Sequence, residues 1–172
     1  MPRAGTRRPK LAPIDGPRLH AEPIGPSRAG ELQKCLDGAP DYFSRTEGSP
    51  AAPDRAAQIL SDADVDPSRR VYLLLPHAGG PALGVLDLNL DAGEPDVAHV
   101  ALLLFRESCQ GIGYGAETVA ELARALSDAG YRAVRASVGD ESPEARAFWE
   151  REGFVEVGRL ADGVTVMERP LA

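Results

Sequence analysis

The segment at residues 97–105 constrains the fold more than any other part of this chain. Its last six residues, 100–105, are all apolar. A strand with apolar residues at successive positions needs cover on both faces, whereas a strand with one solvated face alternates apolar and polar residues. We therefore expect residues 97–105 to form the central strand of a β-sheet that is covered on both sides.

The hydrophobic pattern surrounds this strand with helices and further strands. Strand-like patterns occur at residues 18–24, 71–75, 82–90, 131–138, 154–160 and 164–167. Helical patterns with start and stop signals occur at residues 27–36, from residue 40, and at 54–63, 113–129 and 142–153. Turn residues at 79–81 and 92–95 join three consecutive strands into an antiparallel meander, which a β-α-β-α-β order follows. This order predicts a mixed α/β fold.

The composition excludes several classes of protein. The chain has 172 residues, of which 43% are hydrophobic and 26% charged, as is ordinary for one soluble domain. Its formal net charge of −7 argues against nucleic acid as the main partner. The longest apolar run is too short for a membrane span, and no apolar signal segment follows the first residue. We therefore expect a cytoplasmic protein with no membrane partner.

Cysteine and histidine are too sparse to predict a disulfide framework or a metal site. Cys35 and Cys109 lie far apart and form no C-x-x-C motif, which fits a reducing compartment. His20 and His77 have no ligand partners at metal spacing, so we expect no metal. Cys109 is interpreted as a packing residue rather than a nucleophile.

Residues 1–17 differ in composition from the rest of the chain. They are basic, rich in proline and without an apolar period. Such a segment buries too little apolar surface to fold, so we expect a disordered basic leader followed by a single domain at residues 18–172. A basic arm that touches a partner is the alternative.

The segment at residues 110–116 carries the strongest functional signal. It lies between the central strand and an amphipathic helix, and it contains Gly111, Gly113 and Gly115. Glycines allow a ligand to approach the backbone closely. The start of a helix also presents unpaired N–H groups and the positive end of the helix dipole. The segment therefore predicts a site for a phosphate or pyrophosphate.

Two kinds of ligand compete for this loop. The spacing Gly111-x-Gly113-x-x-Ala116 satisfies the dinucleotide fingerprint, with Asp140 or Glu141 as the ribose acid. However, the chain after Asp140 is too short for the second half of a dinucleotide-binding fold. The antiparallel meander before the loop is also wrong for a doubly wound sheet.

The spacing Gln110-x-x-Gly113-x-Gly115 instead resembles the pyrophosphate loop of the GNAT N-acetyltransferase superfamily. The later segment at residues 145–154, with Phe148, Trp149 and a Gly-Phe ending, is similar to that family's last helix. The resemblance covers roughly residues 18–169. It implies a GNAT-like fold, and transfer of an acyl group, most commonly acetyl, from acyl-CoA to an amine by direct attack on the thioester.

The resemblance also implies which residues bind the co-substrate. The pantetheine arm would pair with the backbone of Leu103, Leu104 and Phe105, as an added strand does. The pyrophosphate would lie on the N–H groups of Gln110, Gly111, Ile112, Gly113, Tyr114, Gly115 and Ala116. Ser142 stands where the family often has an asparagine that contacts the cofactor arm. Trp149 stands where the family often has a tyrosine that protonates the leaving thiolate, and tryptophan has no hydroxyl for that step.

The remaining site residues follow less directly. An attacking amine must lose a proton, and His99 and Asp87, on neighbouring predicted strands, are candidate bases. Tyr42 and Phe43 are candidates for the wall of the acceptor pocket, because the first helices form that wall in the family. For each of these residues, packing in the core or at a sheet edge is the alternative.

The sequence leaves the acceptor open. Small molecules and peptides with an amine both fit, and the protein could be a monomer or a homodimer. A module that binds acyl-CoA without transferring the acyl group is the alternative function. The absence of both a tyrosine at position 149 and an evident base keeps that alternative open.

Overall fold

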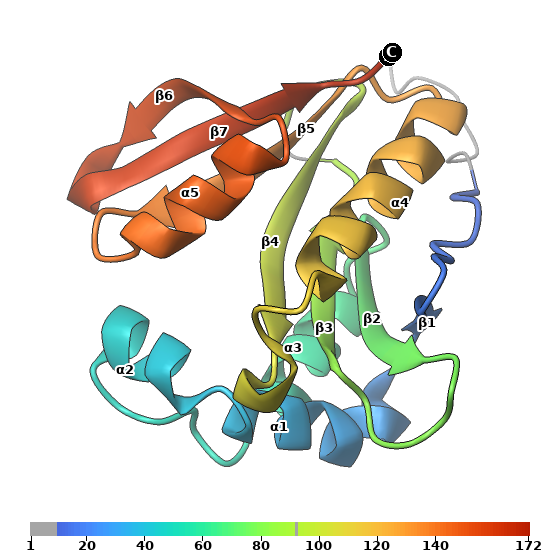
Figure 1. Ribbon diagram of the computed structural model, residues 1–172, viewed down its shortest axis with the longest axis vertical. Helices are drawn as coiled ribbons and strands as arrows, with labels where there is room; N and C mark the ends of the chain where they lie inside the picture. Colours follow the sequence, from blue (N-terminus) through green and yellow to red (C-terminus); the bar gives the residue numbers. More distant parts are fainter. Residues whose placement is uncertain (1–9, 92) are drawn as a thin grey trace.

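A computed structural model describes residues 10–91 and 93–172 (Figure 1). The strands are β1 Leu19–Pro23, β2 Arg69–Pro76, β3 Gly84–Asn89, β4 Val97–Phe105, β5 Ala133–Gly139, β6 Val155–Leu160 and β7 Val164–Pro170. The α-helices are α1 Ala29–Asp37, α2 Pro40–Glu47, α3 Arg55–Asp64, α4 Tyr114–Asp128 and α5 Pro143–Arg151. Short 3-10 helices are η1 Pro26–Arg28, η2 Glu107–Cys109 and η3 Ala161–Gly163. The predicted mixed α/β order is confirmed.

The strands form one mixed sheet in the order β1-β2-β3-β4-β5-β7-β6. Neighbours from β1 to β4 are antiparallel, β4 and β5 are parallel, and β5-β7-β6 are again antiparallel. The predicted central strand, residues 97–105, is indeed the middle strand β4. Its one parallel neighbour rules out the doubly wound sheet that the dinucleotide alternative requires.

Helices cover both faces of the sheet. Figure 1 shows α4 and α5 on the near face, where the predicted stripe of α4 (Val119, Leu122 and Leu126) is buried against the sheet. On the opposite face, Leu36 of α1 and Leu60 of α3 pack in a second cluster with β2 and β3. Burying an aliphatic side chain of this size contributes about 1.5–3 kcal/mol, so both clusters stabilise the sheet from its two sides.

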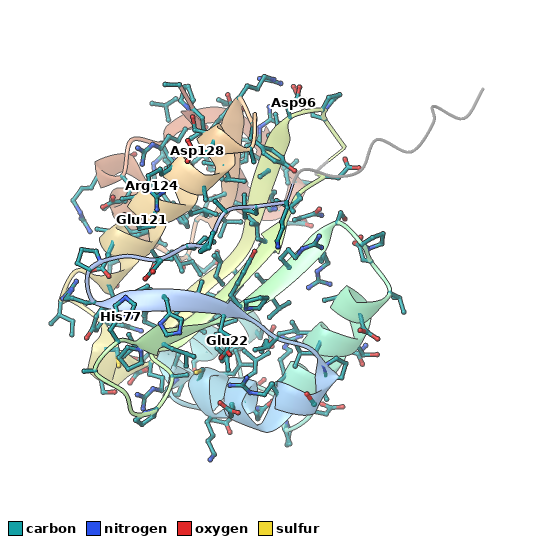
Figure 2. The ribbon with its side chains drawn as sticks, turned by 90° about the vertical axis from the view of Figure 1, so that its right-hand side faces the viewer. Glu22, His77, Asp96, Glu121, Arg124 and Asp128 are labelled. Atoms are coloured by element: carbon teal, nitrogen blue, oxygen red, sulfur yellow. The ribbon has the colours of Figure 1, made fainter. Side chains whose placement is uncertain are left out.

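The outer face of α4 is charged, as expected of an amphipathic helix. Figure 2 shows Glu121, Arg124 and Asp128 along this face, and Glu121 forms an ion pair with Arg124. Within residues 10–91 and 93–172, no helix has the length and apolar character to span a membrane.

The parallel strands β4 and β5 separate along their length, which Figure 1 shows near the middle of β4. They are paired only where Val97–Val100 faces Ala133–Ala136, although β4 runs on to Phe105 and β5 to Gly139. A bulge marks the same point, because Leu88 of β3 pairs with Val100 while Asp87 pairs with Leu102, which leaves Ala101 as the extra residue. Within the described part of the chain, the last residues of β4 therefore pair with no strand on their β5 side.

The folded domain begins earlier than the sequence pattern predicts. Ile14 is buried at 2% exposure, and its carbonyl accepts a hydrogen bond from the N–H of Ala21. The expected boundary at residue 17 is therefore too late, because one apolar residue and a backbone turn suffice to bind this segment to the sheet. Residues 1–9 of the expected leader lie outside the described residues.

Candidate functional site

The larger of two adjoining cavities lies where β4 ends and α4 begins. It has a volume of about 490 Å³, and its wall comes from β4, the loop after it, the start of α4, α5 and Arg45 of α2. The residues predicted to bind the co-substrate that line it are Leu103, Leu104, Phe105, Gln110, Gly111, Gly113, Tyr114, Gly115, Ala116 and Trp149. Segments from three parts of the sequence thus meet at one hollow, at the open edge of β4.

The loop leaves the start of α4 uncapped. Gly113 is the N-cap residue with φ +90°, and among the described residues no side chain makes a capping hydrogen bond at this helix start. The N–H of Glu117 donates a hydrogen bond to the carbonyl of Gly113. This is the first hydrogen bond of the helical pattern, in which each N–H bonds to the carbonyl four residues earlier. The N–H groups of Tyr114, Gly115 and Ala116 precede that of Glu117, and these three residues line the cavity. They can therefore bind an anion, with help from the helix dipole.

Hydrogen bonds fix the loop at its beginning. The side-chain amide of Gln110 donates to the carbonyl of Phe105 at 2.8 Å. The N–H of Glu107 donates to the carbonyl of Gly38 at 2.8 Å, and the Glu107 carboxylate accepts from the N–H of Asp41 at 3.0 Å. The loop is thereby attached both to β4 and to the junction between α1 and α2.

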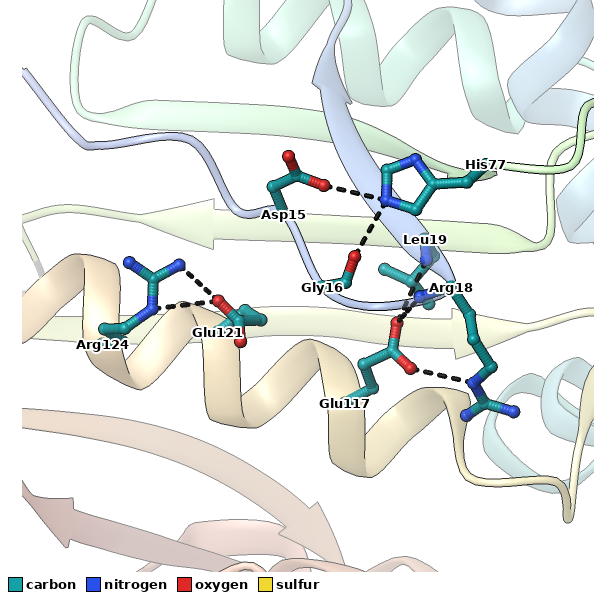
Figure 3. A network of polar contacts seen from close by, with 8 residues as sticks. All are labelled: Asp15, Gly16, Arg18, Leu19, His77, Glu117, Glu121 and Arg124. Atoms are coloured by element: carbon teal, nitrogen blue, oxygen red, sulfur yellow. Dashed lines mark hydrogen bonds and ion pairs between the residues drawn. The ribbon is translucent and has the colours of Figure 1, made fainter.

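A second set of contacts, which the sequence analysis missed, holds the loop and the start of α4 from the chain at β1; Figure 3 shows the contacts with Glu117. Arg18 donates from Nε to Oε1 of Glu117 at 2.9 Å and from Nη1 to the carbonyl of Ile112 at 2.9 Å. The guanidinium also lies over the ring of Tyr114, 4.4 Å from its centroid. Glu117 Oε2 accepts from the N–H groups of Arg18 and Leu19 at 3.0 and 3.1 Å.

The surroundings of Glu117 favour its charged form. Partial burial by itself raises the pKa of this carboxyl, but the hydrogen bonds from the side chain and N–H of Arg18 and from the N–H of Leu19 outweigh it and lower the pKa. Glu117 is therefore ionised at neutral pH, in the first turn of α4, where a negative charge also stabilises the helix.

Glycine at position 115 allows α5 to approach the loop. A Cβ built there would lie 3.0 Å from Cε2 of Phe148. Phe148 packs edge-on against Trp149 at a centroid distance of 5.0 Å, and Trp149 packs likewise on Phe154 at 4.8 Å. Phe148 and Trp149 form the α5 side of the cavity, and the buried ring of Phe154 packs against Trp149. This packing explains why the apolar segment at residues 145–154 lies beside the glycine loop.

A second cavity of about 290 Å³ lies where β4 and β5 separate. It shares Leu103, Ala145 and Trp149 with the first cavity, so the two adjoin. Tyr42 lines this second cavity, as do Ser142 and Glu141. Burial raises the pKa of the Tyr42 phenol; the charge of Arg55 opposes this rise, and the charge of Glu141 adds to it. Because the pKa is raised, Tyr42 is protonated at neutral pH.

Three of the predicted site residues lie elsewhere than expected. Ser142 lines the second cavity and not the first. The side chain of Ile112 is 54% exposed, and only its carbonyl is engaged, by Arg18. Phe43 is buried at 3% exposure in the cluster with α1 and α3, so it packs in the core and does not line the acceptor side.

The two candidate bases differ in their surroundings. Asp87 is 4% exposed and pairs with Arg69 at 2.6 Å. His99 Nε2 lies 3.0 Å from Oγ of Ser137, and Ser137 lines the second cavity. Burial and then the charge of Arg135 lower the pKa of His99, against an opposing effect of Asp87, so this imidazole is neutral at neutral pH. In the described structure neither base lines a cavity itself, but Ser137 connects His99 to one.

Other ligand classes find less support in this structure. Asp140, a candidate ribose acid in the dinucleotide alternative, forms an ion pair with Arg159 at 3.0 Å. Within the described ranges, no three His, Cys, Asp or Glu side chains gather as ligands for a metal ion.

Comparison with known proteins decides the family. The model of the acetyltransferase (GNAT) family matches residues 35–154. This range contains β4, β5, the glycine loop and α5. The chain belongs to the GNAT acetyltransferase family. Membership supports an acyltransferase activity with an acyl-CoA co-substrate.

Solved structures agree with this GNAT assignment. An acetyltransferase from Thermus thermophilus is 31% identical, with a TM-score of 0.82 over 93% of this chain and 100% of that one. A spermidine N-acetyltransferase from Vibrio cholerae, in complex with CoA and spermine, is 17% identical, with a TM-score of 0.66 over 88% and 95%. A PaiA N-acetyltransferase from Thermoplasma acidophilum, in complex with coenzyme A, is 10% identical, with a TM-score of 0.68 over 88% and 98%. The last two show a shared fold.

The residues of this GNAT domain fit coenzyme A. The uncapped start of α4 offers N–H groups to a pyrophosphate, and the loop glycines leave its surface free of side chains. The open edge of β4 offers backbone groups to the amides of a pantetheine arm.

Proposed function

We propose that this protein transfers an acetyl group from acetyl-CoA to an amine by direct attack on the thioester. One observation carries the proposal: an uncapped helix start, an open strand edge and a second cavity in the gap between β4 and β5 follow one another continuously. A pyrophosphate, a chain of amides and a reactive end occur in the same order along acetyl-CoA.

In this proposal the first cavity binds the co-substrate and the second admits the acceptor. The pyrophosphate accepts hydrogen bonds from the N–H groups of Tyr114, Gly115 and Ala116. The pantetheine amides pair with the backbone of residues 103–105. The thioester then lies at the junction of the two cavities, beside Trp149.

His99 serves as the base, through Ser137. The amine nitrogen forms a bond to the thioester carbonyl carbon, and the bond from that carbon to sulfur breaks. The proton of the attacking amine passes to the Ser137 hydroxyl, which gives its own proton to Nε2 of His99. The lowered pKa of His99 keeps this nitrogen free to accept at neutral pH.

The thiolate leaves without an acid at position 149. Trp149 has no hydroxyl, but a thiol has a pKa of about 8.5, so its anion is a tolerable leaving group near neutral pH. The leaving sulfur takes its proton from water. Asp87 is left out of the pathway because Arg69 already occupies one of its oxygens.

The acceptor cavity favours an amine that has no carboxylate beside it. Among the described residues that line this cavity, Glu141 is the one charged side chain, and hydroxyls come from Tyr42, Thr46, Ser137 and Ser142. A carboxylate with several hydroxyls suits a cationic amine, whereas the carboxylate of a free amino acid would lack a cationic partner there. Primary amines of small molecules and peptide N-termini both fit this description.

Release of coenzyme A with a panel of amines tests the proposal. We expect release above buffer hydrolysis with acetyl-CoA and at least one amine, and the mass of that amine should rise by one acetyl group. Binding of acetyl-CoA without release for any amine would contradict transfer and favour a binding module, a function that the absence of a hydroxyl at Trp149 also allows.

A further inference from the structure

We propose that Arg18, on the segment leading into β1, supplies the cation of the pyrophosphate site. This inference rests on the proposed function, because it assigns a contact to the same ligand, at the glycine loop that borders the co-substrate cavity. Arg18 directly precedes β1, the edge strand of the sheet, whereas the other residues of the proposed pyrophosphate and pantetheine site come from β4, α4 and α5.

The loop itself contains no positive side chain. Residues 107–116 include Glu107 and no lysine or arginine. A helix start is equivalent to only about half a positive charge, which is small against a dianionic pyrophosphate. A cation from another element is therefore needed to balance the ligand's charge.

Arg18 lies at the position that such a cation would occupy. A Cβ built on Gly113 would lie 3.2 Å from Arg18 Nη2, so this nitrogen reaches the N-cap of α4. Nη1 is bonded to the carbonyl of Ile112, and the ring of Tyr114 lies under the guanidinium. The side chain is 45% exposed, so a ligand on the loop can reach it.

Glu117 holds the guanidinium in this orientation. It accepts from Nε and from two backbone N–H groups of the chain at β1 (Figure 3). With Nε and Nη1 committed, the planar fork presents Nη2 toward Gly113. Fixing a long side chain before binding lowers the entropy cost of a charge-assisted hydrogen bond to phosphate.

Other arginines near the cavity are placed differently. Arg45 of α2 forms an ion pair with Glu144, and Arg106 donates to the carbonyl of Ala82. Arg151 lines the cavity from α5. Of these four arginines, Arg18 has a hydrogen bond to the glycine loop itself.

Calorimetric titration of Arg18→Gln with acetyl-CoA tests the assignment. We expect the Kd to rise about 10-fold to 100-fold, which is the usual effect of losing a charge-assisted hydrogen bond. Arg18→Lys should recover part of the loss. Arg28→Gln is the matched control, because Arg28 is also held by a glutamate through Nε, at 2.6 Å from Glu31, but lies on η1 away from the loop.

Two comparisons make the test specific. One distinguishes the pyrophosphate from the 3′-phosphate of the ligand, and the other distinguishes Arg18 from Arg151. The loss in Arg18→Gln should persist with acetyl-dephospho-CoA, which keeps the pyrophosphate and lacks the 3′-phosphate. If the loss disappears with that ligand, or occurs in Arg151→Gln and not in Arg18→Gln, the assignment is overturned. If the wild-type protein binds no coenzyme A compound, the proposed function itself fails.

Modification of the wild-type protein provides a test that does not depend on a variant folding. Phenylglyoxal reacts with accessible guanidinium groups, and mass spectrometry locates the product. We expect acetyl-CoA to protect Arg18, and S-acetylpantetheine, which lacks the phosphates, to leave it reactive. Equal reactivity of Arg18 with and without acetyl-CoA would overturn the assignment.

Discussion

At the scale of single residues, Gly113 joins backbone geometry to ligand binding. Its φ of +90° is unfavourable for any residue with a Cβ, and it forms the N-cap of α4. We expect Gly113→Ala to lose about 1–2 kcal/mol of unfolding free energy and to bind acetyl-CoA more weakly. Chemical denaturation and calorimetry measure the two effects.

A matched glycine separates these effects. Gly130, just after α4, has φ +91° and open space around a built Cβ. Gly130→Ala should therefore lose a similar free energy of unfolding while it keeps the affinity for acetyl-CoA. If both variants lose affinity equally, the loop has no special role in binding.

The neutrality of His99 predicts the pH dependence of transfer. Because the pKa of His99 is lowered from 6.5, it stays unprotonated as the pH falls to 6.5 and gains its proton only below that value. The acidic limb of kcat/KM should therefore lie below pH 6.5. His99→Gln should lower kcat about 100-fold or more, the usual contribution of a general base.

His77 provides the control for that experiment. His77 is half-exposed, and its Nε2 hydrogen-bonds to the carbonyl of Gly16, beside β1 at the edge of the sheet (Figure 3). It therefore lies away from Ser137, which is on β5. His77→Gln should leave the pH profile unchanged. An unchanged profile in His99→Gln would exclude His99 as the base.

Glu117 predicts a stability that depends on pH. Its pKa is lower in the folded than in the unfolded protein, so its contribution is present above 4.5 and is lost as the pH falls through the folded value. At neutral pH, Glu117→Gln should cost about 1–3 kcal/mol, because three hydrogen bonds to a charge are weakened.

The control for the stability cost of Glu117→Gln is the same substitution at Glu121, one turn further along α4. Its partner in the ion pair, Arg124, has a side chain that is 52% exposed, so Glu121→Gln should cost at most about 1 kcal/mol. Urea denaturation from neutral pH to below 4.5 should show the deficit of Glu117→Gln shrinking. A deficit that stays constant over this range would contradict the role given to the charge.

At the scale of elements, α4 connects the core to the site. Its buried stripe packs on the sheet, while its first turn lines the larger cavity. Leu122→Ala should destabilise the protein by about 2–5 kcal/mol, the usual cost of a cavity in a core. Arg124→Ala, on the exposed side of α4 (Figure 2), should cost far less than Leu122→Ala.

Thermal or chemical unfolding of the two variants checks this difference. Equal losses would mean that the stripe of α4 is not the side that the core buries.

The elements themselves could be predicted from local signals. The apolar run of β4, the glycines before α4 and Gly130 after it are features of neighbouring residues, and the structure has β4, α4 and their boundaries within one residue of the prediction. The same locality explains why the loop residues could be assigned to one site. Phe43 was harder to predict, because whether an aromatic residue packs in the core or lines a cavity depends on elements distant in sequence.

At the scale of the whole molecule, the contacts that sequence could not predict are those that join distant segments. Arg18 and Glu117 are separated by 99 positions, and His99 and Ser137 by 38. No periodicity relates residues so far apart, and only the curvature and pairing of the sheet bring them together. The late boundary expected at residue 17 has the same cause, since Ile14 is buried by strands that follow it much later.

The central claim is that this GNAT domain binds acetyl-CoA along the open edge of β4 and the start of α4. Calorimetric titration of the wild-type protein with acetyl-CoA, with NADH as the comparison, tests it most directly. We predict saturable binding of one acetyl-CoA per chain and no binding of NADH. A Gly113→Glu variant that remains folded should bind acetyl-CoA much more weakly. Absence of binding for both acetyl-CoA and free coenzyme A would contradict the account.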